Sequence, residues 1–268
     1  MKSFLHKINS YMDAHPKLKK AQSFLELALI LPVLLIILLN VVELSFMTSQ
    51  YLDLLDLTRE AARFASIRDP FDPVSPDQDC STPGLFDFYY DTACVFSPPA
   101  GSANCIDAEF CNGLNAFIVL NPDTDDVVIR VFSVSDEGTY EAKQVWPDDP
   151  LNAPPNDDGY WALSNNDLHG TDSDNNWKYN CHGTEIRTDP YYTLESVSER
   201  LLLTPVSTVM IRSKGFVSVE LYYCYETVLG GPLFTSIVED PLRLHAYTIM
   251  SLPAAAPTPT PRPTATAP

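Results

Sequence analysis

Residues 17–47 read KLKKAQSFLELALILPVLLIILLNVVELSFM, and this stretch decides the fold. Every residue from Leu27 to Leu39 is apolar, and a mostly apolar run continues to Met47. As an α-helix, Leu27 to Met47 extends about 31 Å, which is one hydrocarbon thickness of a bilayer. The stretch therefore predicts a single transmembrane helix.

Two other interpretations of the apolar stretch remain open. A cleaved secretory signal needs small residues in an A-x-A-like site after the apolar run, and the sequence that follows Leu39, NVVELSFMTSQ, has none. A helix buried in a soluble core suits the strictly apolar residues 27–39 by length. The lysines before the run and the lack of other long apolar helices argue against that second interpretation.

The flanking charges predict an orientation. Lys17, Lys19 and Lys20 precede the span, and the next basic residue is Arg59. The positive-inside rule places the N-terminus in the cytoplasm and residues 50–268 on the outside. We therefore expect a single-pass protein of the cell membrane with an extracytoplasmic C-terminal domain.

The helix is expected to continue beyond the bilayer to residue 68. Neither Gly nor Pro occurs between Pro32 and Pro70. Apolar residues recur at helical spacing beside a polar row that holds opposite charges three residues apart. The apolar stripe comprises Leu54, Leu57, Ala61, Phe64 and Ala65, and the charge pairs are Asp56 with Arg59 and Glu60 with Arg63. A helix over 22–68 offers this stripe to a partner outside the membrane.

Composition and charge restrict the class of protein. The chain has 268 residues, 45% hydrophobic residues and a formal net charge of −18. That apolar content excludes global disorder, and the negative charge argues against nucleic acid as a partner. Residues 69–268 carry most of the acids, which fits an acidic body attached to a basic leader.

A processing motif lies at the start of the apolar helix. A short basic leader ends at Ala21, and Gln22-Ser23-Phe24-Leu25-Glu26 follows it. This arrangement resembles a class-III prepilin processing site. A cut between Ala21 and Gln22 makes Glu26 the fifth residue of the mature chain.

The N-terminal quarter resembles the TadE/TadG-like family, the pilin-like proteins of the tight-adherence (Flp) pilus system. The family pattern continues through a proline, a second glutamate and an Ala-Arg-rich stretch. This chain supplies Ala28-Leu29, Pro32, Glu43 and Arg59-Glu60-Ala61-Ala62-Arg63-Phe64-Ala65 at these places. The family usually has glycine before the cut, where this chain has Ala21.

The resemblance implies a role for Glu26 and a set of partners. In pilin-like proteins the fifth-residue carboxylate is thought to pair with the new α-ammonium group when subunits pack in the membrane. Such a pair removes the penalty of an isolated acid in lipid and fixes axial register. The implied partners are other pilin-like subunits, pilus-assembly proteins and a prepilin peptidase. Without the resemblance, Glu26 and Glu43 are two interfacial acids that flank the span.

The C-terminal region predicts an antiparallel β-rich domain, so the fold class is α+β and pilin-like in outline. Strand patterns occur at 85–90, 116–120, 126–134, 139–146, 215–229 and 242–250, and a short helix is expected at 194–203. Segments 126–134 and 139–146 read as a hairpin, and 242–250 can pair with 215–229. Residues 147–190 read as a long polar surface loop.

Four regions follow from these patterns. They are a cytoplasmic leader at 1–21, the transmembrane and projecting helix at 22–68, the extracytoplasmic β-rich domain at 69–250 and a Pro/Thr-rich disordered tail at 251–268.

All six cysteines follow the span, which favours disulfides on an oxidising side of the membrane. They are Cys80, Cys94, Cys105, Cys111, Cys181 and Cys224. The first four lie within 32 residues and are expected to pair mainly among themselves. A zinc site is the alternative, although no C-x-x-C spacing occurs.

Motifs of catalysis and of metal binding are missing from the sequence. No G-x-S-x-G, H-E-x-x-H or P-loop occurs, and Asp172-x-Asp174-x-Asn176 lacks the glycine and glutamate of a calcium loop. We expect no cofactor, no metal and no enzymatic activity. The sequence favours a minor pilin or pilus-assembly component, with a membrane-tethered extracellular binding domain as the alternative and an anchored hydrolase as a weaker one.

Overall fold

The computed structural model describes residues 16–71, 79–81, 87–105, 109–135, 141–147, 159–165, 175–203, 215–229 and 239–252. The chain divides into two compact units. The first comprises residues 1–49 and 226–240, and the second comprises residues 50–225 and 241–268. The tail, apart from its first two residues, lies outside the described residues, as do Asp172 and Asp174 of the calcium-like motif.

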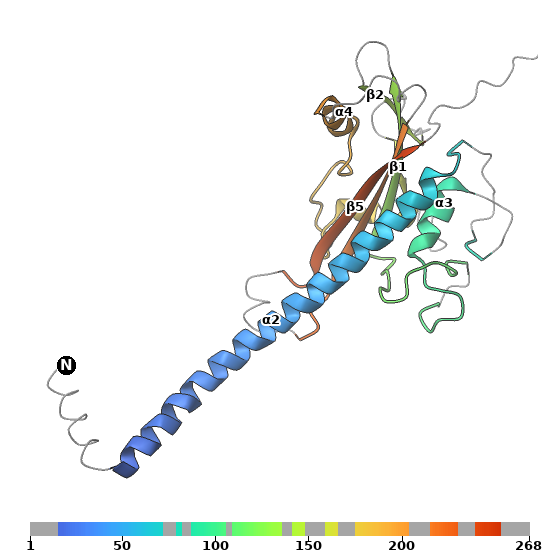
Figure 1. Cartoon of the computed structure of the whole chain (residues 1–268). Helices are drawn as coiled ribbons and strands as arrows, with labels where there is room; N and C mark the ends of the chain where they lie inside the picture. Colours follow the sequence, from blue (N-terminus) through green and yellow to red (C-terminus); the bar gives the residue numbers. More distant parts are fainter. Residues whose placement is uncertain are drawn as a thin grey trace, which may run out of the picture. The chain divides into compact units, whose positions relative to one another are not determined.

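A single 51-residue helix, α2 (Pro16–Ser66), carries the whole apolar stretch (Figure 1). The helix begins six residues before the predicted start, at a proline, which suits the first helical position because its missing N–H is not needed there. Pro32 lies inside the helix without ending it. The predicted stop near residue 68 agrees with the last helical residue to within two positions.

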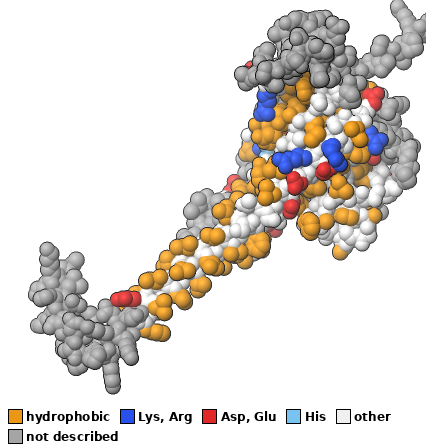
Figure 2. Space-filling model, in the orientation of Figure 1, with side chains coloured by type: hydrophobic (Ala, Val, Ile, Leu, Met, Phe, Trp, Pro, Cys, Tyr) orange, Lys and Arg blue, Asp and Glu red, His pale blue; other side chains and the backbone are white. Residues whose placement is uncertain are grey.

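The first half of α2 exposes its apolar side chains. Leu27, Leu34 and Val41 are 58% exposed, and Figure 2 shows hydrophobic side chains along the visible face of this rod. A helix that exposes apolar side chains in this way needs an apolar solvent around it. Among the described residues, α2 is the one helix long and apolar enough to cross a membrane, which is consistent with a single-pass anchor.

The second half of α2 packs within the second unit. Leu54, Ala61 and Ala65 are fully buried, and the Thr248 hydroxyl of strand β5 (Leu242–Leu252) lies 3.3 Å from that of Thr58. The small side chains of Ala61 and Ala65 let the helix lie close to its neighbours. The predicted apolar stripe therefore exists, and the chain's own domain covers part of it.

The sheet is antiparallel in the order β2 (Glu141–Trp146), β1 (Asp126–Ser135), β4 (Gly215–Tyr225), β5 (Leu242–Leu252). A two-residue strand, β3 (Trp161–Ala162), also pairs with β1. The β1–β2 hairpin and the β4–β5 pairing were both predicted. A long N-terminal helix followed by an antiparallel sheet confirms the α+β class.

Strand β4 is covered on both faces. Val217, Val219 and Leu221 are fully buried, and so are Ser218 and Glu220 on the opposite face. Other elements cover each face. On the face of Ser218 and Glu220, Val197 of α4 (Leu194–Leu203) packs with Phe132 and Val145, and Trp177 packs with Val128 and Tyr222. On the opposite face, Thr58 of α2 lies against Thr248, the residue that pairs with Val219.

Three local predictions were wrong. The strand expected at 85–90 is replaced by helix α3 (Phe88–Ala93), because Asp87 caps its N-terminus by accepting hydrogen bonds from the N–H groups of Tyr89 and Tyr90. Residues 116–120 form no strand. The expected loop at 147–190 contains β3 and two short 3₁₀ helices, Leu163–Asn165 and Asn176–Lys178. Its aromatic side chains account for this order, since Trp161 and Trp177 are buried.

Candidate functional site

The predicted processing residues lie within α2. Ala21 and Gln22 fall in its second turn, and Glu26 follows four residues after Gln22. The Glu26 side chain is exposed, as are its neighbours Phe24 at 72% and Leu27 at 58%. An acid on an exposed apolar helix suits a contact made within a membrane between chains.

Glu43 does not behave as the interfacial acid that the sequence analysis expected. Its side chain is fully buried within the first unit. The N–H of Val228 donates to Oε1 at 2.9 Å, and the N–H of Leu229 donates to Oε2 at 2.7 Å. The partners lie 185 and 186 residues further along the chain, so no local pattern points to them. We call Glu43, Val228 and Leu229 the Glu43 clamp.

All six cysteines form disulfides, and the pairs are Cys80 with Cys94, Cys105 with Cys111, and Cys181 with Cys224. The first four cysteines therefore pair among themselves, as their spacing predicted. A cysteine in a disulfide has no thiolate to offer, so this pairing excludes the zinc alternative for the same six residues.

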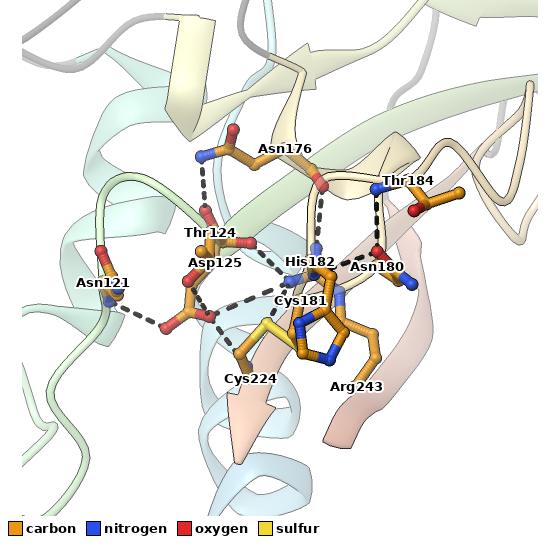
Figure 3. Close-up of a disulfide and its surroundings, with 10 residues drawn as sticks. All are labelled: Asn121, Thr124, Asp125, Asn176, Asn180, Cys181, His182, Thr184, Cys224 and Arg243. Atoms are coloured by element: carbon orange, nitrogen blue, oxygen red, sulfur yellow. Dashed lines mark hydrogen bonds and ion pairs between the residues drawn. A yellow bond between two sulfur atoms is a disulfide. The ribbon is translucent and has the colours of Figure 1, made fainter. Parts of the chain in front are cut away.

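The Cys181–Cys224 disulfide joins the 3₁₀-helical segment after β3 to the end of β4 (Figure 3). The N–H of Cys224 donates to Oδ1 of Asp125 at 2.8 Å, and Nη1 of Arg243 lies 3.1 Å from the Cys224 sulfur. Next to Cys181, Asn180 accepts hydrogen bonds from the N–H groups of His182 and Thr184. The disulfide therefore lies inside a hydrogen-bonded network.

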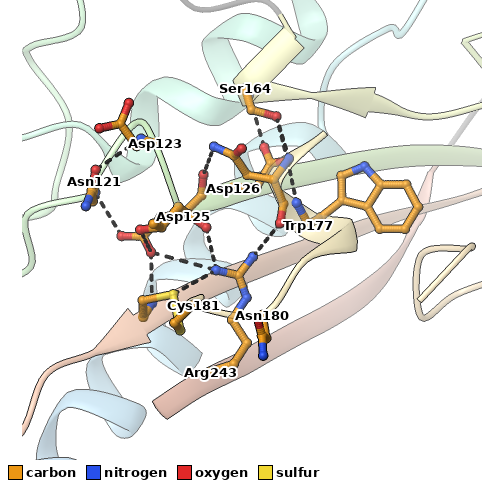
Figure 4. Close-up of polar contacts among 12 residues, drawn as sticks. Asn121, Asp123, Asp125, Asp126, Ser164, Trp177, Asn180, Cys181 and Arg243 are labelled. Carbon is orange, nitrogen blue, oxygen red and sulfur yellow. Dashed lines mark hydrogen bonds and ion pairs between the residues drawn. A yellow bond between two sulfur atoms is a disulfide. The ribbon is translucent and has the colours of Figure 1, made fainter. Parts of the chain in front are cut away.

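The centre of that network is a buried acid–base cluster of Asp125, Asp126 and Arg243 (Figure 4). Arg243 Nη1 lies 3.9 Å from Asp125 Oδ1, and Arg243 Nη2 donates to the carbonyl of Asn176 at 2.9 Å. Asp126 is fully buried and accepts from the N–H and hydroxyl of Ser164 and from the N–H of Trp177. These contacts join β1, β5 and the 3₁₀ helices.

Burial raises the pKa of both carboxyl groups in this cluster. The pKa of Asp125 reaches about 6 despite hydrogen bonds from the N–H groups of Asn121 and Cys224. The pKa of Asp126 also reaches about 6, because burial outweighs the hydrogen bonds from Ser164 and Trp177. Raised carboxyl pKa values can mark catalytic acids. Here Asp125 is 5% exposed and Asp126 is not exposed, so the arrangement suits cross-linking of strands and not contact with a substrate.

A second buried carboxylate, Glu220 of β4, organises the aromatic residues before α4. It accepts hydrogen bonds from the N–H groups of Tyr191 and Tyr192 and from the Tyr222 hydroxyl. His245 Nε2 lies 3.4 Å from the same carboxylate. Burial alone would raise the pKa of Glu220, but the contacts from His245, Tyr222 and the Tyr192 N–H outweigh burial and lower it.

An aromatic surface lies next to Glu220. Tyr191 is 42% exposed and stacks on Tyr247 with ring centroids 4.3 Å apart. The Arg200 guanidinium lies over both Tyr191 and Tyr192. The hydrogen bond between the Tyr191 and Tyr247 hydroxyl groups lowers the pKa of Tyr191. Tyr192 and Tyr222 are buried, whereas Tyr191 keeps an exposed surface.

An acid-rimmed hollow of about 220 Å³ occurs on the second unit, between α2 and the chain at 114–118. Its rim carries three carboxylates of α2, Asp53, Asp56 and Glu60. Phe117 lines it and is 84% exposed. Among the described residues, no group of three or more His, Cys, Asp or Glu side chains is placed to hold a metal ion.

The structure brings together residues that the sequence analysis treated separately and keeps others apart. Asp125, Asp126, Glu220 and Arg243 gather in the core without having been singled out from the sequence. A signal existed, because each lies in or directly before an otherwise apolar strand, where a charge needs a buried partner. Glu26 and Glu43, paired in the sequence analysis as flanking acids, have different surroundings.

Comparison with known proteins gives one match. Residues 21–63 match the family model described as TadE-like protein. No curated protein and no solved structure matches the chain. The match begins at Ala21 and includes Glu26, Glu43 and the Ala-Arg-rich stretch as far as Arg63. Most of α2 is therefore similar to TadE-like proteins, as its motifs predicted.

Proposed function

We propose that the chain is a minor pilin or assembly component of a tight-adherence pilus or a related secretion system. The observation that carries this proposal is the placement of Glu26, five residues past Ala21 on an exposed apolar helix that matches the TadE-like family model. In this proposal α2 crosses the membrane once, with the N-terminus in the cytoplasm and the sheet domain outside. The role is structural and not catalytic.

Glu26 supplies the contact between subunits. Its neighbours on α2 are exposed and apolar, so packing of two such helices would surround the carboxylate with hydrocarbon. An ionised acid there needs a cation, and cleavage after Ala21 creates one at the amino group of Gln22. Pairing of Glu26 of one subunit with that group of a neighbour fixes the axial offset between the two helices.

Substitution of Glu26 tests this function. Glu26→Ala should leave membrane insertion unchanged, because the span keeps its apolar residues, and should reduce recovery in isolated pili or partner complexes at least tenfold. Asp56→Ala is the matched control, since it removes an exposed acid of the same helix whose partner is only Arg59 on the helix surface. Equal recovery of the Glu26→Ala variant and the wild type would contradict the proposal.

Processing is tested by N-terminal sequencing of the protein purified from its native membrane. The proposed cut gives a chain that begins with Gln22, and Gln22 must then carry a free or methylated amino group. A chain that retains its first 21 residues in assembled complexes would remove the cation on which the pairing of Glu26 depends.

A membrane-tethered binding domain is the second candidate. The exposed stack of Tyr191 on Tyr247 beside Arg200 favours it, because an aromatic face suits the C–H face of a sugar ring and a guanidinium can donate to the sugar hydroxyls. Binding of the chain to a glycan array, lost in Tyr191→Ala and kept in Glu26→Ala, would support this candidate. Loss of assembly in Glu26→Ala without any glycan binding supports the pilin-like role.

A further inference from the structure

The Glu43 clamp fixes a second segment of the chain against the apolar helix. Each oxygen of the Glu43 carboxylate accepts a backbone N–H, from Val228 at 2.9 Å and from Leu229 at 2.7 Å. The carboxylate is fully buried, and it accepts a hydrogen bond from each of the two backbone N–H groups. A charge and two backbone groups that would each be costly in hydrocarbon are therefore matched with one another.

The side chains at the clamp are apolar and point away from it. Val228 is 59% exposed and Leu229 is 43% exposed. On the helix, Leu44 at 49% and Phe46 at 44% are also exposed beside Glu43. Polar groups thus lie inside the contact, and apolar side chains form its outer surface.

The height of the clamp along the helix places it within the span. Glu43 follows Leu27 by 16 residues, which is about 24 Å along the helix, whereas the hydrocarbon of a bilayer is about 30 Å thick. With Leu27 at one boundary, Glu43 lies about 6 Å inside the other. Backbone outside a helix or a closed barrel is tolerated at such depth only when its polar groups are satisfied. The clamp provides acceptors for the N–H groups of Val228 and Leu229.

We propose that Val228 and Leu229 form a membrane-contact site that inserts among the acyl chains of the leaflet at the C-terminal end of the span. This inference rests on the proposed single span of α2. The ligand is the hydrocarbon of the lipid and not its headgroup, because the described acids beside the site, Glu226, Glu239 and Asp240, are exposed and would repel anionic headgroups.

The connection that bears the site is closed at its base. The N–H and hydroxyl of Thr227 donate to the two oxygens of Asp240 at 3.1 and 2.8 Å. Thr227 and Asp240 therefore hold the two ends of the connection between β4 and β5 together. The clamp then fixes the position of Val228 and Leu229 relative to the span. The chain would therefore contact lipid through α2 and also through these two residues.

Depth-dependent quenching tests the site in the full chain, reconstituted in phosphatidylcholine vesicles with lipids brominated near the headgroup end or near the methyl end of the acyl chain. Val228→Trp should add fluorescence that is quenched at least twofold more by the shallow bromines than the native tryptophans are. Ile186→Trp is the matched control, an apolar residue 49% exposed on the second unit. Leu34→Trp, at 58% exposure in the span, reports insertion of the helix.

The outcomes separate the inference from the proposed function. Strong quenching of Leu34→Trp with quenching of Val228→Trp no greater than that of Ile186→Trp would overturn the membrane-contact site and leave the span standing. Absence of quenching at Leu34→Trp would overturn both. We expect Val228→Trp to be quenched equally in pure phosphatidylcholine and in vesicles where anionic lipid replaces part of it. Quenching that occurs only with anionic lipid would overturn the assignment to hydrocarbon.

Substitution of Glu43 tests the clamp itself. In the Val228→Trp background, Glu43→Ala removes both acceptors and should reduce shallow quenching to the level of Ile186→Trp, whereas Glu43→Gln keeps one acceptor and should retain part of the effect. Unchanged melting of the sheet domain in both variants shows that the fold is intact. Full quenching in Glu43→Ala would overturn the clamp as the cause of the lipid contact.

Discussion

From Phe24 to Val42, the side chains of α2 are exposed or half-buried, whereas in the sheet domain even ionised groups such as Asp126 and Glu220 are fully buried. The helix presents apolar side chains and one acid to its surroundings and needs lipid or other chains to cover them. The domain pairs these two buried carboxylates with its own hydrogen-bond donors. The first half of α2 therefore exposes the residues through which it can contact its surroundings, whereas the domain keeps its polar interactions in its interior.

The family match lies on the helix. It covers residues 21–63 and includes none of the sheet. The matched residues include the exposed apolar half of α2 and also Leu54 and Ala61, which are buried in the second unit. The buried cluster of Asp125, Asp126 and Arg243 lies outside the match.

Loss of the Cys181–Cys224 disulfide should give the largest decrease in the free energy of unfolding of the domain. The double substitution of both cysteines by alanine releases a segment with a sequence separation of 43 and should lower the free energy of unfolding by about 4 kcal/mol. Chemical denaturation of the full chain in detergent measures this value. The matched control is the double substitution of Cys105 and Cys111, with a separation of six and an expected loss of about 2 kcal/mol. An equal or greater loss in the control would show that the interior network does not depend on the longer bridge.

Titration of Asp126 should give the next largest effect. Its pKa is about 6 in the folded chain against an ordinary value of 3.8, so the folded state holds more protons between pH 4 and pH 6. The contribution of this group to the free energy of unfolding therefore falls as the pH rises through that window. The stability advantage of wild type over Asp126→Asn should be larger at pH 4 than at pH 7 by up to about 3 kcal/mol.

Denaturation curves of both proteins at the two pH values measure this difference. Asp123→Asn is the control for loss of an exposed carboxylate next to the same cluster. An advantage over Asp126→Asn that grows with pH would mean that hydrogen bonds from Ser164 and Trp177 outweigh burial, and the sign of the pKa shift would be reversed.

Removal of the helix cap at Asp87 should have a smaller effect. Asp87→Ala leaves the N–H groups of Tyr89 and Tyr90 without their acceptor and should cost about 1 kcal/mol in thermal denaturation. Asp69→Ala, which removes an exposed turn carboxylate that accepts from the N–H of Phe71, is the control and should cost less. A larger loss for Asp69→Ala would place the more important local contact at the end of α2.

The ion pairs on the surface of α2 should matter least. Arg59 and Asp56 are 3.2 Å apart, and Arg63 and Glu60 are 3.1 Å apart, with all four side chains at least 46% exposed. Arg59→Ala and Arg63→Ala should each lower the free energy of unfolding by no more than about 0.5 kcal/mol. Arg130→Ala is the contrast, because this buried side chain donates to the carbonyls of Gly159 and Tyr192 and its loss should cost several-fold more. Similar losses for Arg59→Ala and Arg130→Ala would remove the distinction between the two regions.

The sequence predicted the elements whose patterns are local. Four such elements occur as predicted: the apolar helix α2, strands β1 and β5, and the helix at Leu194–Leu203. The pattern of each depends on residues within one segment. The i,i+3 charge pairs of α2 also occur, because the helix alone sets their distance.

The features that the sequence missed depend on distant partners. Glu43 is buried by residues 185 and 186 positions away, and Asp126 by Ser164 and Trp177. Segment 116–120 has the composition of a strand but no paired neighbour, so its apolar residues Phe117 and Val119 remain exposed. Propensity is a weak guide where pairing decides.

The register of β1 with β4 has a consequence for the order in which the domain folds. Asp126 pairs with Tyr222 and Ser133 with Gly215, so β1 is complete long before its central partner has been synthesised. Pairing across such a separation is slow, and an unpaired apolar strand edge attracts other chains. All four cysteines of the Cys80–Cys94 and Cys105–Cys111 bridges have been synthesised by then, whereas the partner of Cys181, Cys224, has not. A chain that ends before residue 215 therefore contains the cysteines of both short bridges but lacks the central partner of β1.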